Sequence, residues 1–341
     1  MIDLSFVRIP LPWRVRRFLA WLYVNRHVPI TALRRMGCAP RYRIMLSTAF
    51  FGGVGGTEKH LKALVESMPE SQFYIRARDV KTQGFVPTTH NFSVNWTVHS
   101  GTRFDLYLYF AGGGKPPFEG EKFAFRKKMV ETNGTDVRSI EGAFDYIAIQ
   151  TGNYQKYCDQ HEKCLLAFPD VPSTFPTERE AIDLPERYFL TVFNPFSNAL
   201  KGNDLLYRMA DAAALPIVWC YSDKSGFDFS DLPDHPNIIK QKNLSQPQLY
   251  YAYENASAYV SFSHIESFGW SLAEAFYLGL PIIAREVGFL TYVKDQPGIH
   301  IYTDEEGLRT LLSQGNYQRQ DHDDSLFKRN AYSAVINHIL A

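Results

Sequence analysis

Two glutamates, Glu266 and Glu274, stand eight positions apart in the stretch "HIESFGWSLAEAFYLGLPIIA" (264–284). The pattern predicts a helix that begins after Gly269, so Glu266 precedes the helix and Glu274 lies within it. Eight helical positions rotate by about 80° beyond two full turns, which lets both carboxylates face the same cleft. A carboxylate accepts hydrogen bonds from two hydroxyls at once, which suits a vicinal diol of a ribose or a hexose. The free N–H groups that open such a helix can receive a diphosphate.

Two loops earlier in the chain could bind the same kind of ligand. The stretch "FFGGVGGTEKH" (50–60) places Gly55 and Gly56 between a predicted strand and a predicted helix, where a ligand can approach the main chain. Its glycine spacing is neither that of the dinucleotide fingerprint nor that of a P-loop. The stretch "FNPFSNALKGND" (193–204) places Lys201 in a second strand-to-helix loop, where a lysine can neutralise phosphate oxygens. A tight turn and a solvated lysine are the structural alternatives, and each motif alone is weak evidence.

Alternating strands and helices must position these residues. Apolar runs predict buried strands at 42–51, 104–110, 128–132 and 144–150, and again at 188–193, 216–221, 237–240, 258–263 and 280–285. Helical patterns lie between several of them, at 58–68, 204–213, 246–256 and 270–278. This alternation predicts an α/β protein with doubly wound parallel sheets. In such sheets ligands bind beyond the carboxyl ends of the strands, where the glycine loop, the lysine loop and the glutamate stretch are all expected.

The chain predicts two Rossmann-like domains with an extension at each end. A basic amphipathic extension occupies residues 1–40, and the N-terminal domain follows at 41–170. A proline-rich linker at 171–187 separates it from the C-terminal domain at 188–320. Residues 321–341 are expected to form a helix that packs back toward the N-terminal domain.

Composition excludes several classes of function. The 341 residues carry a formal net charge of zero, which gives no general attraction to nucleic acid. The four cysteines form no Cys-x-x-Cys pair, and no Asp-x-Asp pair lies in a suitable loop, so we expect neither a metal site nor a cofactor. No apolar run approaches the ~20 residues of a membrane span, and no secretory signal is evident. We therefore expect a cytoplasmic protein.

The positive charge is nevertheless concentrated at one end. Residues 1–43 contain nine arginines and a single acid, Asp3, which leaves eight excess positive charges. Helical spacing predicts one apolar stripe in this segment, made of Val15, Phe18, Leu19 and Leu22. Such a helix can lie on an anionic membrane surface, or it can pack on the protein's own body with its arginines in water. The sequence favours neither interpretation over the other.

The glutamate stretch resembles the Glu-x7-Glu signature of retaining glycosyltransferases of the GT-B fold, especially family 4. Its continuation "EAFYLGLPIIA" (274–284) fits that signature, "GGVGGTEKH" is similar to the family's glycine loop, and "NPFSNALKG" resembles its phosphate-binding loop with Lys-Gly. The stretch "EVGFLTYV" (286–293) is similar to a further loop of the family. The resemblance covers about Arg43 to the end of the chain. It implies two Rossmann-like domains that face a cleft and a sugar transfer from a nucleoside diphosphate to an acceptor hydroxyl.

The resemblance also implies a role for each matching residue. Lys201 would contact the diphosphate, Glu274 the ribose hydroxyls and Glu266 the transferred sugar, with the sugar nucleotide as co-substrate. Phe268, Gly269 and Trp270 would offer their N–H groups to the sugar. The remaining implied contacts are Gly55 and Gly56 near the phosphates, Asn133 at the sugar, and Lys240, Asn243 and Leu244 around the base.

Two positions depart from the family's usual pattern. Where many members carry an arginine five residues before the lysine, this chain has Phe196, so another cation such as Arg285 would have to complete the diphosphate site. Where many members have His-Gly after a strand of the first domain, this chain has Asn133-Gly134. An asparagine can hydrogen-bond a sugar hydroxyl, but it cannot titrate.

Three functions remain open at this point. The first is a metal-independent retaining glycosyltransferase of polysaccharide biosynthesis, acting on a glycan or a lipid-linked saccharide. The second is a sugar-nucleotide epimerase or hydrolase of the same fold, and the third is a module that binds sugar nucleotides or glycans without catalysis. An acid beside a helix N-terminus can also be purely structural, although that explains Glu266 better than Glu274.

Overall fold

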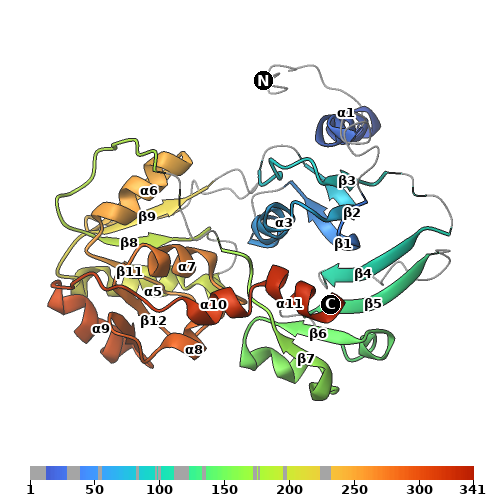
Figure 1. Cartoon of the computed structure of the whole chain (residues 1–341). Coiled ribbons are helices and arrows are strands. Elements are labelled where there is room, and N and C mark those ends of the chain that lie inside the picture. Colours follow the sequence, from blue (N-terminus) through green and yellow to red (C-terminus); the bar gives the residue numbers. More distant parts are fainter. Residues whose placement is uncertain are drawn as a thin grey trace. The chain divides into compact units, whose positions relative to one another are not determined.

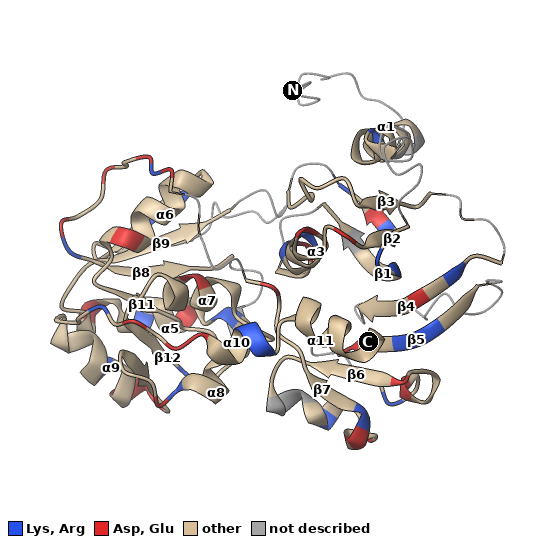
Figure 2. Cartoon of the chain, viewed as in Figure 1, with Lys and Arg blue, Asp and Glu red and all other residues tan. Residues whose placement is uncertain are grey.

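The computed structural model describes residues 13–28, 39–52, 56–81, 84–96, 98, 101–110, 123–132, 136–171, 175, 177–194, 198–222 and 232–341. The chain divides into two compact units (Figure 1). The first unit comprises Met1–Ala148, Tyr157–Leu165 and Ile336–Ala341, and the second comprises Ile149–Lys156 and Leu166–Val335. Acidic and basic residues are interspersed along the elements of both units, as expected for a chain without net charge (Figure 2).

The sheet of the first unit has seven strands in the order β3-β2-β1-β4-β5-β6-β7. Their bounds are β1 Arg43–Phe51, β2 Gln72–Val80, β3 Phe92–Val94, β4 Arg103–Phe110, β5 Ala124–Glu131, β6 Tyr146–Ile149 and β7 Cys164–Leu166. The central strand β1 pairs in parallel with β2 and β4, and its apolar residues Ile44, Met45 and Leu46 are fully buried. Such continuous burial is what a parallel sheet covered on both faces requires.

Three strands of this sheet, β2, β3 and β7, were not predicted from the sequence. Strand β2 alternates buried Phe73, Ile75 and Ala77 with less buried neighbours such as Arg76 and Arg78. A search for continuous apolar runs misses this one-sided pattern, which is common near the edge of a sheet.

The sheet of the second unit has six parallel strands in the order β10-β9-β8-β11-β12-β13. Their bounds are β8 Phe189–Val192, β9 Ile217–Tyr221, β10 Ile238–Lys242, β11 Ala258–Val260, β12 Ile282–Ala284 and β13 Ile299–Ile301. Every strand predicted here is present, and β13 is an additional one. Two parallel-sheet units of Rossmann-like type therefore confirm the predicted fold class.

Helices follow the strands in both units. The α-helices are α1 Trp13–Asn25, α3 Gly56–Ser67, α4 Asn198–Lys201, α5 Asn203–Met209, α6 Gln246–Asn255, α7 Trp270–Tyr277, α8 Leu290–Val293, α9 Glu305–Gln314, α10 Ser325–Arg329 and α11 Tyr332–Leu340. Short 3₁₀ helices are η2 Glu141–Ala143, η3 Gly152–Tyr157, η4 His161–Lys163 and η5 Ala210–Ala212. None of the helices built from described residues is long and apolar enough to cross a membrane.

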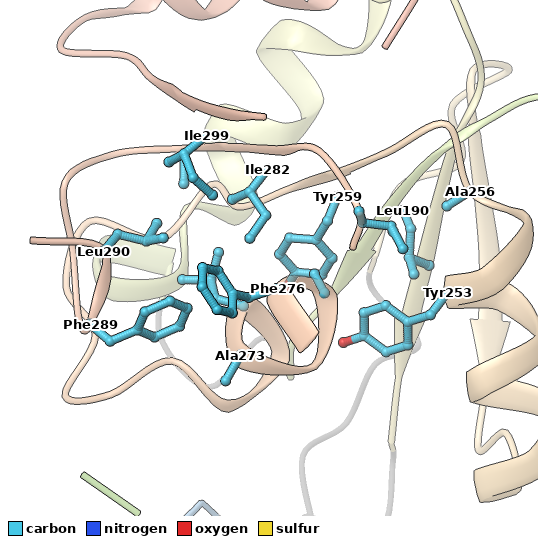
Figure 3. Close-up of a cluster of buried hydrophobic side chains, with 14 of the residues drawn as sticks. Leu190, Tyr253, Ala256, Tyr259, Ala273, Phe276, Ile282, Phe289, Leu290 and Ile299 are labelled. Carbon is cyan, nitrogen blue, oxygen red and sulfur yellow. The ribbon is translucent and has the colours of Figure 1, made fainter. Parts of the chain in front are cut away.

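The second sheet has an apolar core on each face, because successive strand residues point to opposite sides. Leu190 and Ile282 belong to the core under α7, whereas their neighbours Phe189 and Ile283 belong to the core under α5 and α9. Figure 3 shows Ala273 and Phe276 of α7 gathered with Tyr259, Ile282 and Phe289. This packing fixes α7 on the sheet, and with it the predicted glutamate site.

The tail is less helical than predicted for residues 321–341. Residues 321–324 are not helical, and the helices α10 and α11 are separate. Phe168 causes the break, because its N–H donates to the carbonyl of Asn330 at 2.7 Å and its carbonyl accepts from the N–H of Tyr332 at 2.9 Å. That bridge needs extended backbone at Ala331, which no continuous helix can supply.

Helix α1 packs on the edge of the first sheet, beside β3 (Figure 1). The side-chain amide of Asn25 donates to the carbonyl of Val94 at 2.9 Å and accepts from its N–H at 2.7 Å. The rings of Trp21 and Trp96 stack with centroids 5.2 Å apart, and His27 lies 2.6 Å from the carbonyl oxygen of Phe92. Asn25 thus satisfies backbone groups of an edge strand that would otherwise need another partner. Intramolecular packing is therefore the right interpretation for this side of α1.

We predict that Asn25→Ala lowers the free energy of unfolding by about 2 kcal/mol or more, because it leaves both buried groups of Val94 unpaired. Asn255→Ala is the matched control, since Asn255 makes the same i−4 carbonyl contact in α6 but is exposed. The control should change the free energy by no more than about 0.5 kcal/mol. Equal denaturation midpoints for the two variants would contradict the proposed role of Asn25.

Candidate functional site at the start of helix α7

The lysine loop and the glutamate stretch lie against each other in the second unit. The N–H of His264 donates to the carbonyl of Leu200 at 2.9 Å. Gly202 has a φ of 71°, and a Cβ at that position would lie 2.2 Å from the carbonyl oxygen of Phe262. Only glycine fits both the left-handed conformation and the close approach. These contacts hold α4 directly beside the segment between β11 and α7.

The predicted pair Lys201 and Glu266 is brought together by this packing. Nζ of Lys201 lies 2.7 Å from Oε1 of Glu266, a hydrogen-bonded ion pair. The side chains are 28% and 15% exposed, so the pair is partly shielded but reachable from solvent. A cation and a carboxylate held at this distance can meet a phosphate and a hydroxyl of one ligand.

The backbone between Glu266 and α7 is held by a second glycine contact. A Cβ at Gly288 would lie 2.2 Å from the carbonyl oxygen of Phe268 and 3.3 Å from Cβ of Glu266. The Phe268 ring is buried, 5.4 Å from the ring of Phe289, so this side chain anchors the loop. Gly269 has a φ of 88° and precedes the half-buried Trp270, the first residue of α7. Sequence reasoning singled out Gly269 but not Gly288.

Glu274 lies inside the same helix and is almost fully buried. Its Oε2 accepts a hydrogen bond from the hydroxyl of Tyr253 at 3.2 Å. Burial, and then the charge of Glu274, raises the pKa of Tyr253 well above its ordinary value, so Tyr253 remains a hydrogen-bond donor at neutral pH. Burial also raises the pKa of Tyr259, and both Glu266 and Glu274 add to that effect. Both carboxylates therefore lie near enough to Tyr259 to influence it, and whether they face one cleft remains a prediction.

A row of polar side chains lies at the carboxyl ends of β8, β9 and β10. The N–H of Ser222 donates to Oδ1 of Asn194 at 2.8 Å, and its hydroxyl lies 3.3 Å from Oδ1 of Asn243. Asn243 has a φ of 56°, a conformation that asparagine tolerates better than most residues. Of the three, sequence reasoning identified only Asn243. The others could have been found as the first polar residues after their apolar strands.

Other predicted residues of this unit have contacts of their own. Nζ of Lys240 donates to the carbonyl of Leu232 at 3.0 Å and to Oδ1 of Asp234 at 2.8 Å. Leu244 packs against the core under α7. Arg285 donates to the carbonyl of Thr303 at 2.9 Å and lies over the ring of Tyr302. None of these contacts is with Lys201, Glu266 or Glu274, so the roles of Lys240, Leu244 and Arg285 remain predictions.

The first unit contributes fewer described residues to the predicted site. Gly56 begins α3, while Gly55, Asn133 and Phe196 lie outside the described residues. Two residues that sequence reasoning missed meet near the end of β5: Nδ1 of His60 lies 3.8 Å from Oε2 of Glu131, and both side chains are buried. Burial lowers the pKa of His60 to about 3, so the imidazole is neutral at pH 7 and the contact is not an ion pair.

Among the residues that the structure describes, no group of three or more His, Cys, Asp or Glu side chains is placed to hold a metal ion. The polar groups at the start of α7 are the Lys201–Glu266 ion pair and the helix N-terminus, and Glu274 is buried further along the helix. This set suits an anionic ligand that also carries hydroxyl groups.

One family model matches the part of the chain that carries the two glutamates. Residues 231–315 match the family model described as Glycosyl transferases group 1, a stretch that includes Glu266 and Glu274 but not Lys201. HepE from Anabaena, solved with UDP and glucose, is similar in structure with a TM-score of 0.60, 11% identity and coverage of 88% of this chain and 98% of HepE. The chain has the GT-B fold. No curated protein sequence matches the chain.

Two further GT-B structures are similar over most of their length. The lipopolysaccharide outer core galactosyltransferase WaaB has a TM-score of 0.54 and 13% identity, with 87% of this chain and 98% of WaaB covered. A glycosyltransferase involved in avilamycin A biosynthesis has a TM-score of 0.55 and 12% identity, with coverages of 87% and 95%. At these identities the likeness establishes the GT-B fold of the chain and leaves its activity to be argued from the site.

We predict that Gly202→Ala costs about 3 kcal/mol or more in the free energy of unfolding, because its Cβ would collide with the backbone of Phe262. Gly101→Ala separates this collision from backbone strain, since Gly101 has a φ of 88° but no heavy atom within 4 Å of the added Cβ. Strain alone should cost about 1 kcal/mol. If Gly202→Ala and Gly101→Ala lower the melting temperature equally, the close approach at Gly202 is not required.

Proposed function

We propose that this GT-B protein is a retaining glycosyltransferase that moves a sugar, in the simplest case a hexose, from a nucleoside diphosphate to an acceptor hydroxyl. The observation that carries the proposal is the ion pair of Lys201 and Glu266 at the start of α7, with Glu274 buried in the same helix. The family-model match over 231–315 and the similarity in fold to HepE, which was also solved with UDP-glucose, support the same function.

The chemistry assigns a separate task to each part of the site. The leaving diphosphate would take up negative charge as the bond to the sugar breaks, and Lys201 with the first N–H groups of α7 would stabilise that charge. No divalent ion is needed in this account, because the cation and the helix supply the positive potential. The acceptor hydroxyl would form the new bond on the face that the diphosphate leaves, and its proton would pass to a departing phosphate oxygen. No enzyme carboxylate then has to act as a nucleophile, unlike in retaining glycoside hydrolases.

The two glutamates would hold hydroxyl groups of the donor. Glu266, beside Lys201, would bind the transferred sugar, and Glu274 would bind the ribose. Arg285 would add positive charge near the diphosphate, while Lys240, Asn243 and Leu244 would border the base. Gly55, Gly56 and Asn133 of the first unit would complete the donor site. The acceptor on this proposal is a glycan or a lipid-linked saccharide of polysaccharide biosynthesis, used at the cytoplasmic face of a membrane.

We predict that Glu274→Gln weakens binding of the bare nucleoside diphosphate and of the sugar nucleotide alike, by about tenfold or more, because glutamine loses a charge-assisted hydrogen bond. Glu266→Gln should leave the affinity for the bare nucleoside diphosphate within about threefold of wild type but strongly slow sugar transfer. Isothermal titration calorimetry with both ligands and a turnover assay measure the two effects.

Glu305→Gln is the control for the charge change, since Glu305 forms a surface ion pair with Arg208 at the start of α9. It should leave affinity and turnover unchanged. Equal weakening of the bare nucleotide by both site variants would refute the division of tasks between the glutamates. Product analysis of the wild type decides the reaction: a new glycosidic bond with retained anomeric configuration supports the proposal, whereas an altered or hydrolysed sugar nucleotide, or binding without turnover, rejects it.

A further inference from the structure

We propose that the outer face of α1, formed by Val15, Phe18 and Leu22, is a docking surface for an anionic lipid bilayer. These three side chains are spaced three and four residues apart, so they share one face of the helix. They are 38%, 57% and 44% exposed. None of these three residues belongs to the proposed donor site, so the inference does not depend on the proposed function.

The neighbouring side of α1 packs on the sheet, and the Phe18 ring adjoins it, with its centroid 6.1 Å from that of Trp21. Val24 and Asn25 are buried, and Trp21 is stacked on Trp96 next to β3. One side of the helix therefore packs on the sheet, and three of the four residues of the predicted apolar stripe remain exposed to solvent. The two interpretations of the N-terminal segment do not exclude each other, because the packed residues and the exposed residues are different side chains of one helix.

Exposed apolar side chains are concentrated on helix α1. Six large apolar side chains are exposed among the described residues, and three of them belong to α1. The other three, Leu200, Ile265 and Tyr292, belong to the second unit. Single exposed apolar residues are ordinary, whereas a group on one helix face marks a contact surface.

Charge identifies the partner. Residues 1–43 carry eight excess positive charges, although the chain as a whole is neutral. A second copy of the chain would bring the same positive segment to the interface and repel the first. An anionic bilayer offers both the opposite charge and an apolar layer that three side chains can enter. Because α1 is held against β3, the contact would set the orientation of the first unit on the membrane.

Vesicle flotation tests the proposal directly. The full chain should float with vesicles of phosphatidylglycerol and phosphatidylcholine, and should float poorly with phosphatidylcholine alone. Raising the salt concentration should weaken the binding, because it screens the arginines. The triple variant Val15→Ser, Phe18→Ser, Leu22→Ser should lose about tenfold or more of its partitioning, since three apolar contacts with the bilayer are removed.

The matched control replaces the other exposed apolar residues: Leu200→Ser, Ile265→Ser and Tyr292→Ser. This control should float like the wild type. Thermal melting of both triple variants verifies folding, which is needed because Phe18 and Tyr292 also contact the rings of Trp21 and Phe168. The proposal is overturned if the wild type does not float, if the α1 variant floats as well as the wild type, or if both triple variants lose binding equally. A wild-type dimer that the α1 substitutions dissociate would assign this face to a second copy of the chain instead.

Discussion

The close approach of Gly202 to the carbonyl of Phe262 determines where the lysine of the candidate site can be. With the hydrogen bond from His264 to Leu200, it fastens a short helix to the end of β11 and places Lys201 2.7 Å from Glu266. The corresponding approach of Gly288 to Phe268 fixes the backbone that carries Glu266. A side chain at either glycine would separate these segments, so the ion pair depends on backbone packing that leaves no room for a Cβ.

Burying the carboxylate of Glu274 lowers the stability of the fold, so its presence in the core calls for an explanation. Glu274 is buried among the core residues beside α7, where a polar side chain costs stability unless it is hydrogen-bonded. The hydroxyl of Tyr253 provides one such bond, and Tyr253 in turn stacks on Tyr259 with ring centroids 5.9 Å apart. Packing alone would favour an apolar residue at this position. The Tyr253 hydroxyl also lies 3.1 Å from the carbonyl oxygen of Ser271, and its single proton can serve only one of the two acceptors. The hydroxyl of a bound ligand, as proposed for the ribose, would give the Glu274 carboxylate a further donor.

Much of this could be predicted from the sequence, because parallel strands buried on both faces read as continuous apolar runs. Five strands of the six-stranded sheet, and the placement of the glutamate stretch and the lysine loop at the same edge of it, followed from that pattern. Strand β2 was missed because only one of its faces is deeply buried, and the interruption between α10 and α11 was missed because it depends on a distant residue, Phe168. Gly288 was missed for the same reason, because its importance comes from the carbonyl of Phe268, twenty positions earlier in the chain. Helix α1 shows the limit most clearly, since its apolar stripe was predicted but the sheet edge that Asn25 completes was not.

Hydrogen–deuterium exchange with a nucleoside diphosphate tests the central claim most directly, namely that the start of α7 and the adjoining lysine loop form the diphosphate site. The ligand should be the nucleoside diphosphate that raises the melting temperature most, since binding to the folded state stabilises it. The account predicts slower exchange at residues 198–203 and 266–272, where backbone amides and Lys201 would surround the diphosphate. Helix α9, on the other core of the same sheet, should exchange as before. Protection confined to other segments, with residues 198–203 and 266–272 unchanged at saturating nucleotide, would contradict the account.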